Sequence, residues 1–265
     1  GGEWRGREAE PERSGNTSPP VWGERSRRVF EPWGEGALCG VAEALRTMHV
    51  LPLILLPGMG ADAKLFGGQV ARFPTLRVPE WLPPHPHESL HRYAKRLATT
   101  VAPGGPCVVG GASFGGIVAL EMAAHLRATA CVLIGSIRSP AELSRRWRVC
   151  RPLALLGPDH LGRLAGVAAR LPGIGDATRR RLRRLASPEA AFVRWATCAV
   201  LTWQPSPATR TVRVFQLHGE CDHTFPPALS RADAIVPGGQ HALSLFNPAA
   251  VNAYLERVLT AVTAS

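Results

Sequence analysis

The fold of this chain is decided by one stretch, Cys107-Val108-Val109-Gly110-Gly111-Ala112-Ser113-Phe114-Gly115-Gly116-Ile117-Val118-Ala119-Leu120. Its apolar first residues predict a buried strand, and the small apolar residues after Ser113 predict a helix over 114–126. At the junction, Gly111-Ala112-Ser113-Phe114-Gly115 matches the pattern G-x-S-x-G, in which a tight strand-to-helix turn exposes the serine hydroxyl. Gly111 and Gly115 leave room for neighbouring backbone in such a turn. Ser113 is therefore the candidate nucleophile, and a chance glycine-rich turn is the alternative interpretation.

A serine nucleophile needs a base, and the base needs a third group that orients it. Downstream, a predicted strand is followed by His218-Gly219-Glu220-Cys221-Asp222-His223-Thr224-Phe225-Pro226. A second short strand is followed by Pro237-Gly238-Gly239-Gln240-His241, just before the last predicted helix. The order Ser113, Asp222, His241 is the order that a G-x-S-x-G elbow requires of its acid and its histidine.

Three acids compete for the role of the orienting carboxylate. Asp222 lies in a loop after a strand, although it could also serve only to cap that loop. Glu220 is the nearest rival, and Glu121, two helical turns after Ser113, is expected to buttress the region instead.

Three histidines compete for the role of the base. His241 fits the expected position, whereas His218 ends a strand and is expected to hold the acid loop by hydrogen bonds. His223 is adjacent to Asp222 in sequence, so its side chain should diverge from the carboxylate.

A fourth component would bind the negative charge that develops on a substrate carbonyl oxygen. The glycine-rich loop Leu55-Leu56-Pro57-Gly58-Met59-Gly60-Ala61-Asp62 follows the first predicted strand and can turn backbone N–H groups toward that oxygen. We expect the donors of this oxyanion hole to be the backbone N–H groups of Met59 and Phe114.

Strand and helix patterns alternate along most of the chain, which predicts a three-layer α/β/α sandwich with a mostly parallel sheet of about six strands. The predicted strands are 50–56, 75–78, 107–110, 131–134, 212–217 and 234–236, and helices are predicted at 88–101, 114–126 and 248–263. The stretch 140–205 breaks this alternation, because it is helical by pattern and has no convincing strand. We interpret it as a helical cap over the carboxyl edge of the sheet, with Trp147, Trp195 and Trp203 either lining a substrate site or packing cap against core.

These motifs together resemble the α/β-hydrolase superfamily, and within it the small esterase-like members with a helical cap. The resemblance covers residues 48–265 and implies a serine hydrolase that cleaves a carboxylic ester or related small-molecule acyl compound. In that scheme Ser113 attacks to form an acyl-enzyme, His241 relays the proton and Asp222 fixes the imidazole, with no metal or organic cofactor.

Two features depart from the family pattern. The first two antiparallel strands are missing or lie in the N-terminal extension, and Pro57-Gly58 stands where many relatives have His-Gly. Acyl transfer or thioester hydrolysis on the same residues is an alternative activity, and a non-catalytic ligand-binding receptor is an alternative class.

Residues 1–47 are rich in Gly, Pro, Glu and Arg and show no sustained apolar period, which predicts a disordered N-terminal extension before a domain at 48–265.

The net charge is +11, and residues 138–213 hold fifteen arginines against four acids, so this one segment accounts for the whole excess of positive charge. We interpret the arginines, which are densest at Thr178–Leu185, as a solvated helical face, with attraction of acidic substrates as the alternative and nucleic-acid binding as a weaker one.

Six scattered cysteines without a C-x-x-C pair favour reduced thiols and a cytoplasmic protein. No apolar run approaches the ~20 residues of a membrane span. His85 and His87 could ligate a metal, but no Cys, Asp or His at a matching spacing accompanies them. We therefore interpret this segment as an exposed loop.

Overall fold

The structure, a computed structural model, describes residues 51–264 and contains one sheet of six strands. The strands are β1 (Leu53–Leu56), β2 (Leu76–Arg77), β3 (Cys107–Ala112), β4 (Ala128–Ile134), β5 (Val214–Gly219) and β6 (Ala234–Val236). Their order in the sheet is β2-β1-β3-β4-β5-β6, and every neighbouring pair is parallel. The predicted α/β fold with six strands is confirmed, while the predicted extension at 1–47 lies outside the described residues.

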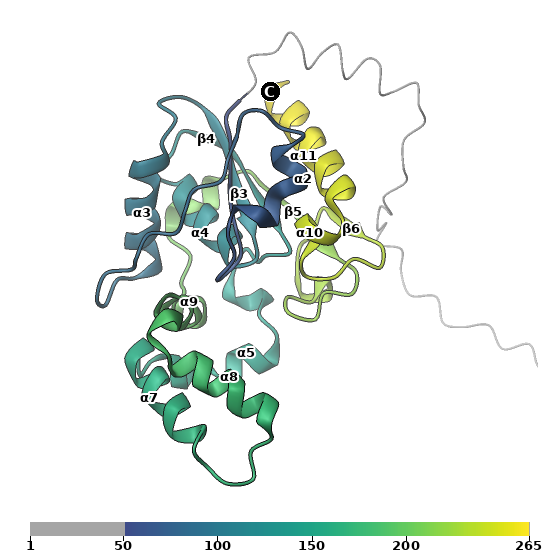
Figure 1. The fold of residues 1–265 in the computed structure, drawn as a ribbon. Helices are drawn as coiled ribbons and strands as arrows, with labels where there is room; N and C mark the ends of the chain where they lie inside the picture. The colour runs from purple at the N-terminus through teal and green to yellow at the C-terminus, as the bar shows by residue number, and fades with distance from the viewer. Residues whose placement is uncertain (1–50, 265) are drawn as a thin grey trace, which may run out of the picture.

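Alternating side chains along the central strands divide the core into two layers. In β1, Ile54 and Leu56 pack on one face of the sheet, and Leu53 and Leu55 pack on the other. The first face is covered by α3 (Leu90–Val101) and α4 (Phe114–Ala123), and the second by α2 (Gly67–Val70), α10 (Leu243–Phe246) and α11 (Pro248–Thr263). Figure 1 shows these helices on either side of the sheet, which makes the three layers of the predicted sandwich.

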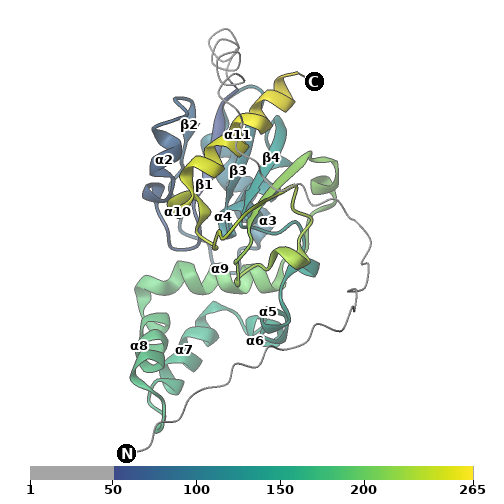
Figure 2. The ribbon, with the colours of Figure 1, turned by 90° about the vertical axis from the view of Figure 1, so that its right-hand side faces the viewer.

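Between β4 and β5 the chain forms a helical insertion without a strand, as the pattern of 140–205 predicts. It contains η2 (Pro140–Glu142), α5 (Arg145–Val149), α6 (Arg151–Ala154), α7 (Pro158–Ala168), α8 (Asp176–Ala186), η3 (Pro188–Ala190) and α9 (Ala191–Thr202). In Figures 1 and 2 these helices lie together at one end of the sheet, with α9 nearest to it. The remaining short 3-10 helices are η1 (Ala63–Phe66), η4 (Pro207–Thr211) and η5 (Pro227–Leu229).

The insertion is fastened to the sandwich through apolar and aromatic side chains of α9. Trp195 and Trp203 are buried in the same cluster as Phe114 of α4, and Trp147 packs against that cluster from α5. The Trp195 indole also donates a hydrogen bond to the Glu88 carbonyl oxygen at 2.9 Å. Trp195 and Trp203 therefore join the insertion to the core, which was one of their two predicted roles.

The sheet differs from the sequence prediction in small respects. Strands β3 and β5 each run two residues further than predicted, so His218 lies inside β5 and not at its end.

Cys107 and Cys131 are buried in β3 and β4, and the five cysteines that the structure describes are free thiols. Within residues 51–264, no helix has the length and apolar character needed to cross a bilayer.

Candidate active site

The turn between β3 and α4 holds Ser113 in a strained backbone conformation. Its φ is 52° and its ψ is −122°, a region that residues with a Cβ rarely adopt. Three hydrogen bonds hold this conformation: the Ser113 N–H donates to the Ile134 carbonyl oxygen at 3.0 Å, while the Ser113 carbonyl oxygen accepts from the Gly116 N–H at 3.0 Å and the Ser136 hydroxyl at 2.6 Å. The turn thus places the half-buried Ser113 side chain at the start of α4.

The two glycines of the pattern are required by close backbone approach. A Cβ on Gly111 would lie 2.6 Å from the Leu56 carbonyl oxygen and 2.5 Å from the Gly115 carbonyl carbon. A Cβ on Gly115 would overlap the carbonyl oxygens of both Leu56 and Pro57. Because those atoms belong to backbone, no side-chain rotation can relieve the overlap.

Three side chains from distant loops meet at this turn. The Ser113 Oγ lies 2.8 Å from the His241 Nε2, and the His241 Nδ1 lies 2.8 Å from the Asp222 Oδ2. Asp222 follows the end of β5 and His241 follows the end of β6, and the carboxyl ends of parallel strands share one edge of the sheet. The topology therefore brings together residues that are 128 and 19 positions apart.

The environment of Asp222 prepares it to accept a hydrogen bond from the imidazole. Its side chain is fully buried, and its Oδ1 accepts the N–H groups of Thr224 at 2.8 Å and Phe225 at 3.0 Å. A carboxylate can only accept, so the proton of a neutral His241 lies on Nδ1. The His241 Nε2 is then the acceptor for the Ser113 hydroxyl.

Two backbone amides near Ser113 have no acceptor. Neither the Met59 N–H nor the Phe114 N–H donates to another residue within 51–264. Phe114 begins α4, where N–H groups have no partner inside the helix. The Met59 loop is close by, because a Cβ on Gly58 would lie 3.7 Å from the Ser113 Cβ. Both predicted donors thus belong to segments that lie beside the serine, and neither is engaged by another residue within 51–264.

The rival acids are engaged elsewhere. The Glu220 Oε2 accepts the Gly238 N–H at 2.8 Å and braces an exposed turn. The Glu121 Oε1 accepts the Trp203 indole N–H at 2.8 Å and the Ser206 N–H at 3.0 Å, so Glu121 supports the junction between α4 and the insertion.

The rival histidines do not contact Ser113. His218 is fully buried, and its Nε2 lies 2.8 Å from the Ser136 carbonyl oxygen in the loop after β4. The backbone of Phe225, in the acid loop, also acts on its imidazole. Burial lowers the pKa of His218 because desolvation penalises the charged imidazolium. His223 is exposed. His85 and His87 are exposed as well, and no group of three or more potential metal ligands occurs within 51–264.

Several residues of the site were not identified from the sequence. The Ser136 hydroxyl donates to the Ser113 carbonyl oxygen, but Ser136 belongs to no recognisable sequence motif. Its position just after β4, at the carboxyl edge of the sheet, is the one feature of the sequence that could have identified it. An aromatic cluster surrounds Phe114: its ring centroid lies 5.5 Å from that of Trp81 and 6.1 Å from that of Phe192. Trp81 comes from a proline-rich loop and Phe192 from α9, so only the fold brings them together.

The insertion also contacts the Met59 loop directly. The Thr197 hydroxyl of α9 lies 3.6 Å from the Met59 sulfur, and a Cβ on Gly60 would lie 3.6 Å from the Val193 Cγ2. Helix α9 therefore lies over one side of the candidate site.

Comparison with known proteins agrees with this architecture. A family model described as the alpha/beta hydrolase family matches residues 7–254. A search of curated proteins found no match.

Similar solved structures include an esterase from Thermogutta terrifontis, with 21% identity, a TM-score of 0.55 and coverage of 80% of this chain and 90% of that one. A carboxylesterase from Nitrososphaera gargenis has 19% identity and a TM-score of 0.53 over 81% of this chain and 92% of its own. A putative lipase from Acinetobacter baumannii has 17% identity and a TM-score of 0.52 over 82% and 86%. Since the family model spans most of the sequence, the chain belongs to the α/β hydrolase family.

Proposed function

We propose that the protein is a serine hydrolase that cleaves a carboxylic ester or a related acyl compound through Ser113, His241 and Asp222. The observation that carries the proposal is the unbroken pair of 2.8 Å contacts from the Ser113 Oγ to His241 and from His241 to the Asp222 carboxylate. A hydroxyl, an imidazole and a buried carboxylate in this order form the arrangement that activates a serine.

In the first half of the reaction, the Ser113 Oγ attacks the substrate carbonyl carbon while its proton moves to the His241 Nε2. The carbonyl oxygen becomes an oxyanion, for which the Met59 and Phe114 N–H groups are the proposed donors. The bond between the carbonyl carbon and the leaving oxygen then breaks, and that oxygen takes the proton from the His241 Nε2. An acyl group remains on Ser113, and the alcohol departs.

In the second half, water takes the place of the alcohol. It gives a proton to the His241 Nε2 and attacks the acyl carbon, after which the Ser113 Oγ leaves and recovers that proton. Asp222 does not change protonation; it holds the imidazole in one tautomer and stabilises the imidazolium. Esterases and a lipase among the similar structures favour an ester over other acyl compounds.

The decisive experiment compares the wild type with Ser113→Ala. We expect a fluorophosphonate probe to label the wild type and not the variant, and hydrolysis of p-nitrophenyl acetate to fall by about 10⁴–10⁶ in kcat. Ser230→Ala is the matched control, because it removes a serine hydroxyl that donates to the Pro227 carbonyl oxygen and should leave labelling at Ser113 intact. Labelling that persists in Ser113→Ala would exclude Ser113 as the nucleophile.

The same assay separates an enzyme from a receptor. Release of many equivalents of p-nitrophenol per protein supports turnover, whereas stoichiometric binding without product would contradict the proposed hydrolysis.

A further inference from the structure

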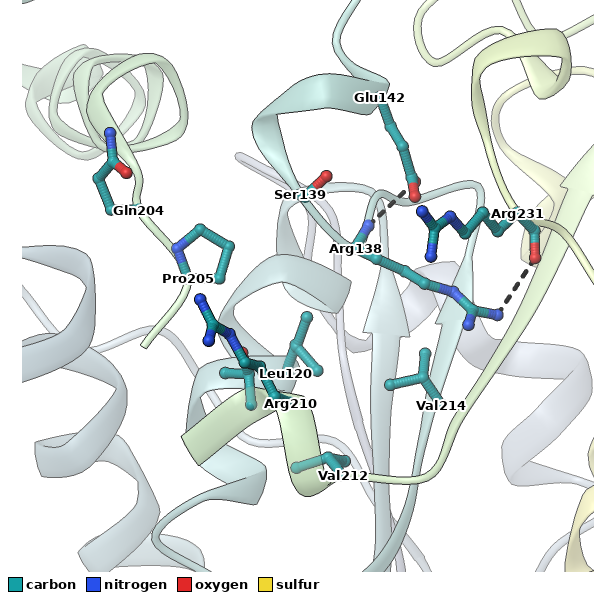
Figure 3. A pocket seen from close by; sticks show the side chains of 11 residues that line it. Leu120, Arg138, Ser139, Glu142, Gln204, Pro205, Arg210, Val212, Val214 and Arg231 are labelled. Carbon is teal, nitrogen blue, oxygen red and sulfur yellow. Dashed lines mark hydrogen bonds between the residues drawn. The ribbon is translucent and has the colours of Figure 1, made fainter. Parts of the chain in front are cut away.

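A cavity of about 570 Å³ lies beside the candidate active site but is not part of it. None of Ser113, His241 and Asp222 lines the cavity. One wall is Leu120 of α4, seven residues beyond Ser113, which places it about 10 Å away along the helix axis. The other walls come from the start of the insertion, the loop before η4 and strand β5, as Figure 3 shows. A volume of this size accommodates a small organic molecule.

Three arginines line the cavity, and two of them have exposed side chains without a partner among residues 51–264. The Arg138 guanidinium is engaged, since it donates to the Gln216 Oε1 at 2.7 Å and to the Asp233 Oδ2 at 3.0 Å. The side chains of Arg210 and Arg231 make no hydrogen bond or ion pair with any residue in the described part of the chain. In Figure 3 Arg210 extends toward Pro205 from one side, and Arg231 extends toward Glu142 and Arg138 from the other.

Glu142 is the acid on the cavity wall, and it does not neutralise these two arginines. Its Oε2 accepts the Arg138 N–H at 3.0 Å and the Gln216 amide at 3.0 Å, and its side chain is buried. Neither Arg210 nor Arg231 lies within ion-pair distance of it. The cavity therefore holds two guanidinium groups that have no ion-pair partner among the residues that line it.

The wall between the arginines is apolar. Leu120 is buried, and the side chains of Val212 and Val214 pack against the core cluster of α4 while lining the cavity. A ligand that fits would present an anionic group to the guanidinium groups and an apolar body to these residues. Guanidinium groups bind carboxylate and phosphate oxygens in a bidentate manner, so either anion satisfies the cationic side.

We propose that this cavity is a binding site for a small organic anion, a carboxylate or phosphate monoester, held by Arg210 and Arg231 with its apolar part against Val212 and Val214. The site is separate from the proposed ester hydrolysis and does not depend on it.

The test uses phenyl phosphate as the probe and isothermal titration calorimetry of the full chain. We expect the double variant Arg210→Gln/Arg231→Gln to bind phenyl phosphate about tenfold or more weakly than the wild type. The matched control is Arg180→Gln/Arg183→Gln, which removes the same charge from two exposed arginines of α8. Because none of these four side chains has a partner within 51–264, both variants should keep the wild-type melting temperature.

Each outcome decides a part of the proposal. A loss confined to the cavity variant supports the site, whereas unchanged binding in that variant, or an equal loss in both variants, would overturn it. Inorganic phosphate and benzoate separate the sources of affinity: phosphate binding as tight as that of phenyl phosphate would overturn the apolar subsite. Benzoate binding that is lost in the same variant would show that the anionic group need not be a phosphate. Soaking crystals with 4-bromophenyl phosphate and locating the bromine by its anomalous signal checks the position independently.

Discussion

Ser113 shows how a single residue can be held in a conformation that its own backbone disfavours. Its positive φ costs on the order of 1–3 kcal/mol for a residue with a Cβ. The hydrogen bonds to Ile134 and Ser136 offset this cost, and the missing side chains at Gly111 and Gly115 make the turn sterically possible. The strain points the hydroxyl out of the turn toward His241.

Gly115→Ala tests the steric requirement of this turn. The added methyl would overlap the carbonyl oxygens of Leu56 and Pro57, so we expect the free energy of unfolding to fall by about 3 kcal/mol or more. Urea denaturation followed by circular dichroism measures this change. Gly105→Ala is the control, because nothing lies within 4 Å of its Cβ position, and it should change the free energy by less than about 0.5 kcal/mol. Similar losses in both variants would argue against the overlap.

Asp222→Asn tests the orientation of the imidazole. An amide at this position can donate to the His241 Nδ1, which favours the tautomer whose Nε2 carries the proton and cannot accept from Ser113. We expect kcat on p-nitrophenyl acetate to fall by about 10⁴ with the fold intact. Glu220→Gln, which changes the exposed rival acid in the same loop, should leave kcat within a factor of a few. The assignment of Asp222 fails if Glu220→Gln is the more damaging change.

At the scale of elements, α4 and the insertion depend on each other. All ten residues of α4 are buried, which is possible because α3 and α9 pack on the helix where the sheet does not. The carboxylate of Glu121 in α4 accepts hydrogen bonds from the Trp203 indole at the end of α9 and from the Ser206 amide just before η4. If the insertion moved away from α4, the Glu121 carboxylate would lose its donors and apolar side chains of α4 would become exposed.

Arg194 joins the helices of the insertion to one another. From α9, its Nη1 donates to the carbonyl oxygens of Leu185 at 2.8 Å and Ser187 at 2.6 Å, which end α8. Gly162 of α7 makes room for it, since a Cβ there would lie 2.9 Å from the Arg194 Nε. The side chain therefore links its own helix α9 to α7 and to the end of α8.

Arg194→Met should consequently lower the free energy of unfolding by about 1–3 kcal/mol, because two carbonyl groups at the end of α8 lose their donor. Thermal and urea denaturation provide the measurement. Arg180→Met, on the exposed face of α8, is the matched control and should have an effect below about 0.5 kcal/mol. Equal stability of Arg194→Met and the wild type would show that water replaces the lost donor.

At the scale of the whole molecule, folding is coupled to the protonation of a buried histidine. Burial lowers the pKa of His218 below its ordinary value of 6.5, so between the folded pKa and 6.5 the unfolded chain binds more protons than the folded one. The free energy of unfolding must then rise with pH across this window. The stability that His218 contributes is present above pH 6.5 and is lost as the pH falls toward the folded pKa.

Denaturation series between pH 4.5 and 8 check this coupling. We expect the wild type to gain stability as the pH rises toward 6.5, and His218→Gln to lose part of that slope, at most about 1.4 kcal/mol per pH unit. The slope is the informative quantity, because the variant also changes the contact with Ser136 and with it the absolute stability. An unchanged slope in His218→Gln would assign the pH dependence to other groups.

The sequence by itself determined the elements of the sandwich and the turn at Ser113. Buried parallel strands are continuous apolar runs, and the elbow needs glycines two positions from the serine, so both are properties of neighbouring residues. The order of the loops alone singles out Asp222 and His241 as candidates, whereas the predicted bounds of the strands differ from the observed ones by up to three residues.

Only the tertiary structure decided which distant side chains meet. The support of Ser113 by Ser136, the aromatic contacts of Phe114 with Trp81 and Phe192, and the cavity with Arg210 and Arg231 each join segments far apart in the chain. Their positions depend on the order of strands in the sheet and on how the insertion packs against it. Local residue patterns encode backbone conformation, burial and the loops of a known motif, but they do not specify which side chains outside such a motif come into contact.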